Sequence, residues 1–187
     1  MYFCTTSSYI KSNICFATAD KIEGPYTYQD TILYSGYGQS DADKTNLSEV
    51  LGADADISRY FEYGGYNNKE WPNCIDPSTF TDADGKLWMV YGSWSGGIFV
   101  LELDPATGYP IHPVTDEAGG VDAYYGTRIA GGGHHSIEGP YIQYDADTGY
   151  YYLFVSYGNL TSDGGYQVRQ FRSENPDGPY VDAAGQS

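Results

Sequence analysis

Two carboxylates in the sequence have the residue type and the surroundings that acid–base chemistry needs. Asp76 precedes Pro77, Glu138 precedes a Gly-Pro pair, and an isoleucine comes directly before each acid. Paired carboxylates are typical of glycoside hydrolysis, in which one group protonates the leaving oxygen and another activates water. Acids at such places also serve as turn residues or strand-start caps. The spacing alone leaves both interpretations open.

The elements around the two acids follow one repeated order. After Asp76 the sequence predicts strands over 77–81, 86–93 and 98–103, and after Glu138 over 140–144, 150–156 and 166–171. The two acids are 62 residues apart, and a repeated meander predicts β-propeller blades, although about 40–50 residues per blade is commoner. Because the first strand of a blade lines the central channel, we expect both acids at the start of such a strand, with their carboxyl groups facing one shared cavity.

The strand pattern predicts an all-β fold in a single domain with four parts. These are the end of a first blade (1–33), a long inter-blade loop (34–72) with a short helix near 46–51, a second blade (76–130) and a third blade (137–183). A closed propeller has about four to eight blades. We therefore expect a partial propeller of about three blades, a fragment of a longer protein that leaves apolar inter-blade faces exposed.

Composition and charge exclude several classes of function. The sequence contains nine Lys and Arg residues and 25 Asp and Glu residues, which gives a formal net charge of −16. Nucleic acids and anionic membranes are unfavourable partners for such a chain, because each phosphate contact needs a cationic side chain. The sequence has no apolar run of about 20 residues that could span a bilayer, and its first residues do not resemble a signal peptide. Neutral or cationic ligands fit this charge better.

The three cysteines do not form a recognisable scaffold. Cys4, Cys15 and Cys74 lack zinc-site spacing and are too few for a disulfide framework. Cys4 and Cys15 would face each other if residues 1–6 and 13–18 form a hairpin. Free, half-buried thiols are nevertheless the preferred interpretation.

Three strings resemble, in order and spacing, motifs of glycoside hydrolase family 43. They are Asn73–Phe80, Tyr91–Ile98 and Ser136–Tyr141, and the run Gly164–Arg169 adds to the resemblance to the endo-1,5-α-L-arabinanase branch. The resemblance covers roughly residues 1–183. It implies a five-bladed β-propeller, a secreted protein, and hydrolysis of the α-1,5-linked L-arabinofuranosyl bonds of arabinan with inversion.

The resemblance also implies roles for individual residues. Glu138 would be the general acid, and Asp76 the carboxylate that orients it and raises its pKa. Sugar subsites would be lined by Asn73, Ser93, Trp94 and Ser95. Trp94 would offer an apolar face to a furanose ring, although a packed inter-blade aromatic is the alternative.

His135 is a further candidate for substrate binding, on different grounds. It follows His134 and lies three residues before Glu138. It could hydrogen-bond substrate or tune the acid. A solvated loop pair is the equal alternative.

The sequence also departs from the family pattern. The family's general base, an Asp in an Asp-Pro motif that opens the first blade, is expected just upstream of Met1 and is missing here. Glu23 lies in the same Ile-Glu-Gly-Pro-Tyr string as Glu138 but at a predicted outer rim. The family's channel histidine, which helps to hold a central metal ion, commonly calcium, is also missing. We expect the chain alone to be inactive.

No metal ligand set is identifiable in the sequence, and calcium is expected only in the complete propeller. Asp41, Asp43 and Asn46, or Asp54 and Asp56, have oxygen-ligand spacing, but they lack the glycine and bidentate Glu of a calcium loop. An acidic surface loop is the preferred interpretation.

Two alternatives to an endo-acting arabinanase remain. The first is an exo-acting arabinofuranosidase or β-xylosidase of the same family, because specificity depends on subsite loops. The second is a non-catalytic carbohydrate-binding propeller, which would keep Trp94 but would not need two converging acids. In the enzyme interpretation the partner is arabinan or an arabino-oligosaccharide.

Overall fold

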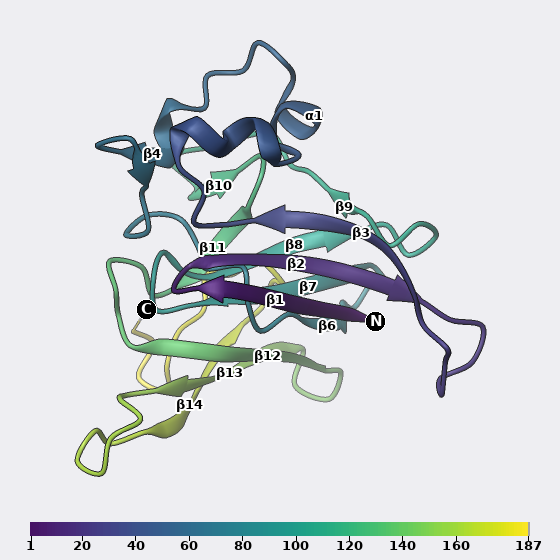
Figure 1. Cartoon of the computed structure of the whole chain (residues 1–187). Coiled ribbons are helices and arrows are strands. Elements are labelled where there is room, and N and C mark those ends of the chain that lie inside the picture. The colour runs from purple at the N-terminus through teal and green to yellow at the C-terminus, as the bar shows by residue number, and fades with distance from the viewer. Residues whose placement is uncertain (187) are drawn as a thin grey trace.

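The computed structural model describes residues 1–186 and consists mainly of antiparallel β-sheet (Figure 1). Three sheets of three or more strands follow one another along the chain. Its one α-helix has five residues, and no helix in the described residues is long and apolar enough to cross a membrane. The predicted all-β fold is therefore confirmed.

The first sheet is a three-stranded meander. Its strands, in the order β1-β2-β3, are Tyr2–Ser8, Lys11–Thr18 and Thr27–Tyr34. The middle strand β2 is buried over 14–17, where it lies between its two partners. Its hydrophobic residues therefore anchor the sheet on the core.

The register of β1 and β2 corrects one prediction about the cysteines. The hairpin forms, but Phe3 is opposite Cys15 and Cys4 is opposite Ile14. Side chains alternate between the two faces of a sheet, so an offset of one residue puts the two cysteines on opposite faces. Cys4 is exposed, Cys15 and Cys74 are buried, and all three are free. The prediction that Cys4 faces Cys15 is wrong.

The segment between the first and second sheets has short elements of its own. They are a 3₁₀ helix at Gln39–Lys44, α1 at Leu47–Leu51, a second 3₁₀ helix at Ser58–Tyr60, and a small hairpin of β4 (Phe61–Glu62) and β5 (Gly65–Tyr66). The helix predicted near 46–51 is α1. Leu47 and Tyr60 are buried in the core, so this segment is an integral part of the packing.

The second sheet has the order β10-β11-β8-β7-β6, with β9 paired to β8. Its strands are β6 Ser78–Thr81, β7 Leu87–Ser93, β8 Gly97–Leu103, β9 Pro110–Ile111, β10 Val121–Asp122 and β11 Gly126–Ala130. The sequence predicted the first three strands but not β11. That strand has few apolar residues and lies between glycines, so it gives a weak strand signal.

The third sheet repeats the meander, with β12 at Ile137–Asp145, β13 at Tyr150–Tyr157 and β14 at Gln167–Ser173. Strand β12 begins three residues before the predicted start at 140. Glu138 is therefore its second residue, whereas Asp76 lies two residues before β6 begins. The expectation that each acid is the first residue of a strand is wrong in this detail.

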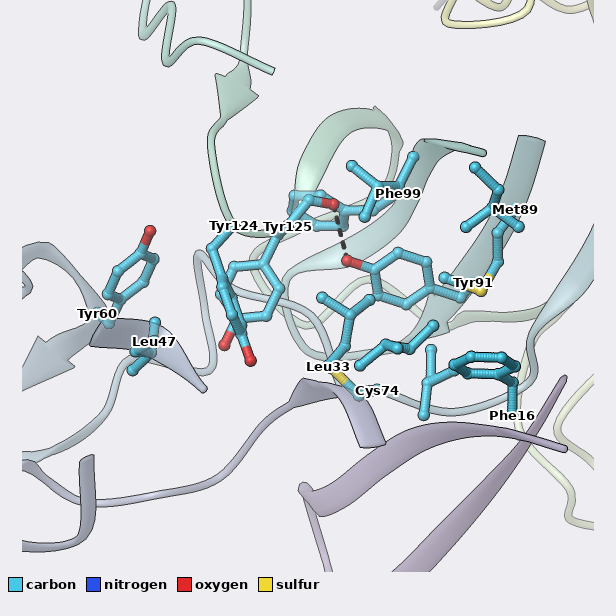
Figure 2. Packing of buried hydrophobic residues seen from close by; sticks show 14 of the residues in the cluster. Phe16, Leu33, Leu47, Tyr60, Cys74, Met89, Tyr91, Phe99, Tyr124 and Tyr125 are labelled. Carbon is cyan, nitrogen blue, oxygen red and sulfur yellow. Dashed lines mark hydrogen bonds between the residues drawn. The ribbon is translucent and has the colours of Figure 1, made fainter. Parts of the chain in front are cut away.

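Two hydrophobic clusters hold the sheets together. The larger cluster joins the first sheet, the connecting segment and the second sheet, and the smaller one joins the second and third sheets. Figure 2 shows part of the larger cluster, in which the Tyr91 hydroxyl donates to the Tyr125 carbonyl at 2.7 Å. In the smaller cluster Phe80 and Val90 pack with Ile142. Strand β12 packs against β6, β7 and β8, which brings the segments of Asp76 and Glu138 together.

Candidate functional site

The backbone at Asp76 leaves the regular strand geometry just before β6. Asp76 has a φ of 53°, in the left-handed region that non-glycine residues seldom adopt. The turn is fixed from both sides, since the Ile75 N–H donates to the Asn73 carbonyl at 2.8 Å and the Gly92 N–H donates to the Ile75 carbonyl at 3.0 Å. Such backbone strain costs on the order of 1–3 kcal/mol and clusters at functional sites. This conformation makes Asp76 a candidate functional residue independently of any motif.

Glu138 lies where the ladder between β12 and β13 is irregular. It pairs with Ser156, and the register shifts between Glu138 and Tyr141. Gly139 inside this bulge has a φ of 59°, where a glycine avoids the cost of a Cβ atom. Bulges of this kind are common next to active sites, where they change the direction in which a side chain points.

Two hydroxyl groups donate to the half-buried Glu138 carboxylate. The Tyr166 hydroxyl donates to Oε1 at 2.6 Å, and the Ser93 hydroxyl donates to Oε2 at 3.4 Å. Tyr166 precedes β14 and Ser93 ends β7, so the carboxylate is held by two sheets. The first bond is short, whereas the second is long and weak.

Asp76 and Glu138 interact electrostatically across the two sheets. The pKa of Asp76 is raised, first by the loss of hydration and second by the negative charge of Glu138, while the Gly139 N–H acts in the opposite direction. The family resemblance implies that Asp76 acts on Glu138. The structure shows the effect of the pair at Asp76.

The two carboxylates lie at an open edge of the molecule. Asp76 is exposed and Glu138 is half-buried. Neither residue lines any of five cavities described within residues 1–186. The expected shared cavity therefore stays a prediction.

The turn between β7 and β8 carries three of the predicted subsite residues. Ser93 and Ser95 are buried, Trp94 is half-buried, and the Ser95 hydroxyl has no hydrogen-bond partner in the described part of the chain. Gly96 allows a close approach, since a Cβ there would lie 2.3 Å from the Trp71 carbonyl carbon. The connecting segment thus fixes the turn beside Glu138.

Asn73 and His135 lie in different surroundings. Asn73 is buried, with its Oδ1 accepting from the Ser35 hydroxyl at 3.5 Å. His135 is exposed, its Nδ1 contacts the Gly132 carbonyl oxygen at 2.6 Å, and it borders a mainly apolar cavity of about 490 Å³ that Ile137 also lines. The structure thus ties Asn73 to the first sheet and His135 to its own loop, and substrate binding by either residue stays a prediction.

Tyr166 is the one contact of Glu138 that the sequence reasoning missed. The run Gly164–Arg169 contributes to the family resemblance, but that resemblance implies no role for the tyrosine. The missed signal is the glycine-rich turn directly before this tyrosine, which is typical of a chain that approaches other backbone closely.

The described residues contain no group of three or more His, Cys, Asp or Glu side chains arranged to hold a metal ion. Two of the acids with calcium-like spacing are engaged locally. Asp41 pairs with Lys44 at 2.6 Å, and the Asp56 carboxylate accepts the Ser58 N–H at 2.9 Å. These residues do not fit a calcium site.

Comparisons with known proteins identify the family of this chain. The sequence model of the family described as glycosyl hydrolases family 43 matches residues 32–187. The chain is 44% identical to an extracellular endo-α-(1→5)-L-arabinanase of Thermotoga petrophila, over 100% of this chain and 35% of that protein. It is 45% identical to extracellular endo-α-(1→5)-L-arabinanase 2 of Bacillus subtilis, over 94% of this chain and 31% of that protein.

The structural comparison gives the same family. A crystal structure of the endo-1,5-α-L-arabinanase from Thermotoga petrophila superposes with a TM-score of 0.78 and 43% identity, covering 100% of this chain and 38% of that chain. The chain thus spans about a third of the length of the relatives that it matches, as a partial propeller should. By its matching family model, its repeated blades and its similarity to these proteins, the chain belongs to glycosyl hydrolases family 43.

Proposed function

We propose that this chain is part of a hydrolase that cleaves the α-1,5-linked L-arabinofuranosyl bonds of arabinan with inversion of configuration. The observation that carries the proposal is the packing of β12 against β6 and β7, which brings Glu138 to Ser93 and to the segment of Asp76. The printed names of the relatives, which are endo-α-(1→5)-L-arabinanases, support the substrate class.

In the proposed reaction Glu138 is the general acid. It gives its proton to the glycosidic oxygen while the bond from that oxygen to the anomeric carbon breaks. A water molecule attacks the opposite face of the sugar and gives its proton to a second carboxylate, which produces the inverted product. We assign that second carboxylate, the general base, to sequence outside residues 1–187. Asp76 holds negative charge beside Glu138, which favours the protonated acid before transfer.

Substrate binding is assigned to the residues around the acid. Ser93, Trp94 and Ser95 lie on one turn next to Glu138, and the open part of the Trp94 ring offers an apolar surface to a pentose. Asn73 and His135 complete the predicted set. Calcium is proposed only for a complete propeller, for which the described residues offer no ligand group.

The relatives also bear on the two alternatives and on location. An extracellular exo-α-(1→5)-L-arabinofuranosidase of Cellvibrio japonicus is 32% identical over 60% of this chain, a weaker match than the two endo-acting relatives of Thermotoga petrophila and Bacillus subtilis named above. A non-catalytic binding propeller would not need the strained Asp76 beside Glu138. The word extracellular in the relatives' names supports the proposal that this protein acts outside the cell.

The decisive experiment measures the release of reducing sugar from linear 1,5-α-arabinan. It compares this chain with a chain extended at both ends to the length of its relatives, as wild type and as Glu138→Gln. We expect activity in the extended wild type and a loss of about 10²–10⁴-fold in Glu138→Gln, since that is the range for a missing general acid. Glu23→Gln is the matched control, because Glu23 lies in the same five-residue string but is exposed. It should keep full activity.

The same assay distinguishes the alternatives. Random shortening of the polymer indicates endo action, whereas release of arabinose or one short product from an end indicates exo action. NMR of the first product should show the anomer opposite to that of the substrate. An extended wild type that is inactive on arabinan, xylan and aryl arabinofuranosides would leave the binding propeller as the better proposal.

A further inference from the structure

Tyr166 makes the shortest contact to the proposed general acid. Its hydroxyl donates to Glu138 Oε1 at 2.6 Å, whereas Ser93 reaches only Oε2, at 3.4 Å. Ser156 on the neighbouring strand β13 is the cross-strand partner of Glu138. The tyrosine oxygen is thus in contact with the Glu138 side chain on β12.

A tight turn fixes the position of Tyr166. The Gly158 N–H donates to the Ser136 carbonyl at 3.1 Å, and the Asn159 N–H donates to the Gly164 carbonyl at 3.0 Å. A Cβ on Gly164 would lie 2.2 Å from the Asn159 carbonyl oxygen, so only glycine lets the two arms of the turn approach this closely. The turn places Tyr166 directly before β14, within reach of the start of β12.

We propose that Tyr166 is a positioning residue that holds Glu138 Oε1, leaves Oε2 to carry the transferred proton, and stabilises the carboxylate formed when that proton has left. The proposal rests on the proposed function, because it needs Glu138 to act as the general acid. It adds a residue that neither the motif comparison nor the chemistry of paired carboxylates identified.

In such an arrangement the two oxygens of the Glu138 carboxyl group are not equivalent. A hydroxyl that donates to Oε1 favours the proton on Oε2, which has only the long contact to Ser93. When Oε2 gives its proton to the glycosidic oxygen, negative charge develops on the carboxylate. The bond from Tyr166 then becomes charge-assisted and gains strength as the reaction proceeds.

Tyr166 and Asp76 act on the acid in opposite directions. A donor to the carboxylate favours its ionised form, whereas a neighbouring negative charge favours its protonated form. Glu138 and, to a smaller extent, Asp76 raise the pKa of Tyr166 itself, so its hydroxyl stays protonated as a donor. On the Glu138 segment the nearest titratable residues are His134 and His135, and the His135 ring bonds the Gly132 carbonyl.

The test is Tyr166→Phe in the extended chain, which keeps the ring and removes only the hydroxyl. We expect kcat on arabinan to fall about 10–100-fold, within the range that one preorganised donor supplies. The alkaline limb of the kcat/KM profile should move to higher pH, because the ionised acid loses a donor. The variant should lose less kcat on aryl arabino-oligosaccharides with an activated leaving group, since these substrates need less proton donation.

Tyr141→Phe is the matched control. Tyr141 is an exposed tyrosine on β12, and its hydroxyl makes no hydrogen bond within residues 1–186. The Tyr141→Phe variant should leave both kcat and the pH profile unchanged. Thermal unfolding of both variants checks that the fold is intact.

The outcomes separate this inference from the proposed function. An active wild type with a Tyr166→Phe variant of equal kcat and equal pH profile would overturn the positioning role and leave the hydrolase proposal standing. A fall in kcat by the same factor on both substrate types, with the alkaline limb unmoved, would indicate a merely structural tyrosine and also overturn it. An inactive wild type would instead count against the proposed function.

Discussion

Asp76 and Glu138 belong to different blades, and the negative charge of Glu138 helps to raise the pKa of Asp76. The pair exists because β12 packs against β6 and β7, with Asp76 in a left-handed turn and Glu138 at a bulge. Three separate features of the backbone thus converge on one charge pair. The energetic cost of an ionised Asp76 in this arrangement can be tested directly in the isolated chain.

Asp76→Asn should stabilise the isolated chain at neutral pH. A carboxyl with a raised pKa favours folding below its unfolded value, about 3.9, and this contribution is lost as the pH rises through the raised folded value. Asparagine removes the charge and tolerates a positive φ. We expect Tm at pH 7 to rise by about 1–3 °C, and the gain to vanish near pH 3. Thermal melts from pH 3 to 7 measure both effects, and a lower Tm at pH 7 would contradict the prediction.

Trp94→Ala should weaken substrate binding in the extended chain more than it slows the chemical step. Loss of one aromatic face costs about 1–2 kcal/mol, which predicts a KM for arabino-oligosaccharides that is higher by about 5–30-fold. Steady-state kinetics measure the split between kcat and KM. Trp88→Phe is the control, because the Trp88 ring N–H bonds Asp82 at 2.9 Å in a β-turn. An unchanged KM in Trp94→Ala would support the packed-aromatic interpretation.

Tyr91→Phe should destabilise the larger core cluster. The Tyr91 hydroxyl is fully buried and donates to the Tyr125 carbonyl at 2.7 Å (Figure 2). Removing the donor leaves a buried carbonyl unsatisfied, which costs about 1–3 kcal/mol. Urea unfolding gives the difference, with Tyr63→Phe as the control, since Tyr63 is fully exposed. Equal stability of the two variants would refute this account of the core.

The third sheet exposes large apolar side chains on its outer strands. Val168 on β14 is 70% exposed and Tyr141 on β12 is 49% exposed. We expect the isolated chain to self-associate through this sheet, and Val168→Lys to reduce the apparent mass at a given concentration. Light scattering after size exclusion measures this apparent mass. Val114→Lys is the control, because Val114 is 89% exposed and lies far along the chain from Val168. A monomeric wild type at high concentration would show that these side chains do not drive association.

The sequence by itself determined the repeat and the residues that carry the chemistry. Alternating apolar runs between acidic turns predict strands because the side chains of a strand alternate between core and solvent. The matching surroundings of Asp76 and Glu138 predict equivalent places in successive blades. Both signals are local, and for this reason they can be recognised in the sequence without knowledge of the packing.

Only the tertiary structure decided which groups meet. A shift of one residue in register separates Cys4 from Cys15, and a turn between two strands brings Tyr166 to Glu138. The connecting segment was expected as a loop, yet the Tyr60 hydroxyl bonds the buried Asp122 carboxylate at 3.0 Å, 62 residues along the chain. Such contacts depend on register, bulges and the packing of one blade on the next. These are set by the free energy of the whole fold and leave no local pattern in the sequence.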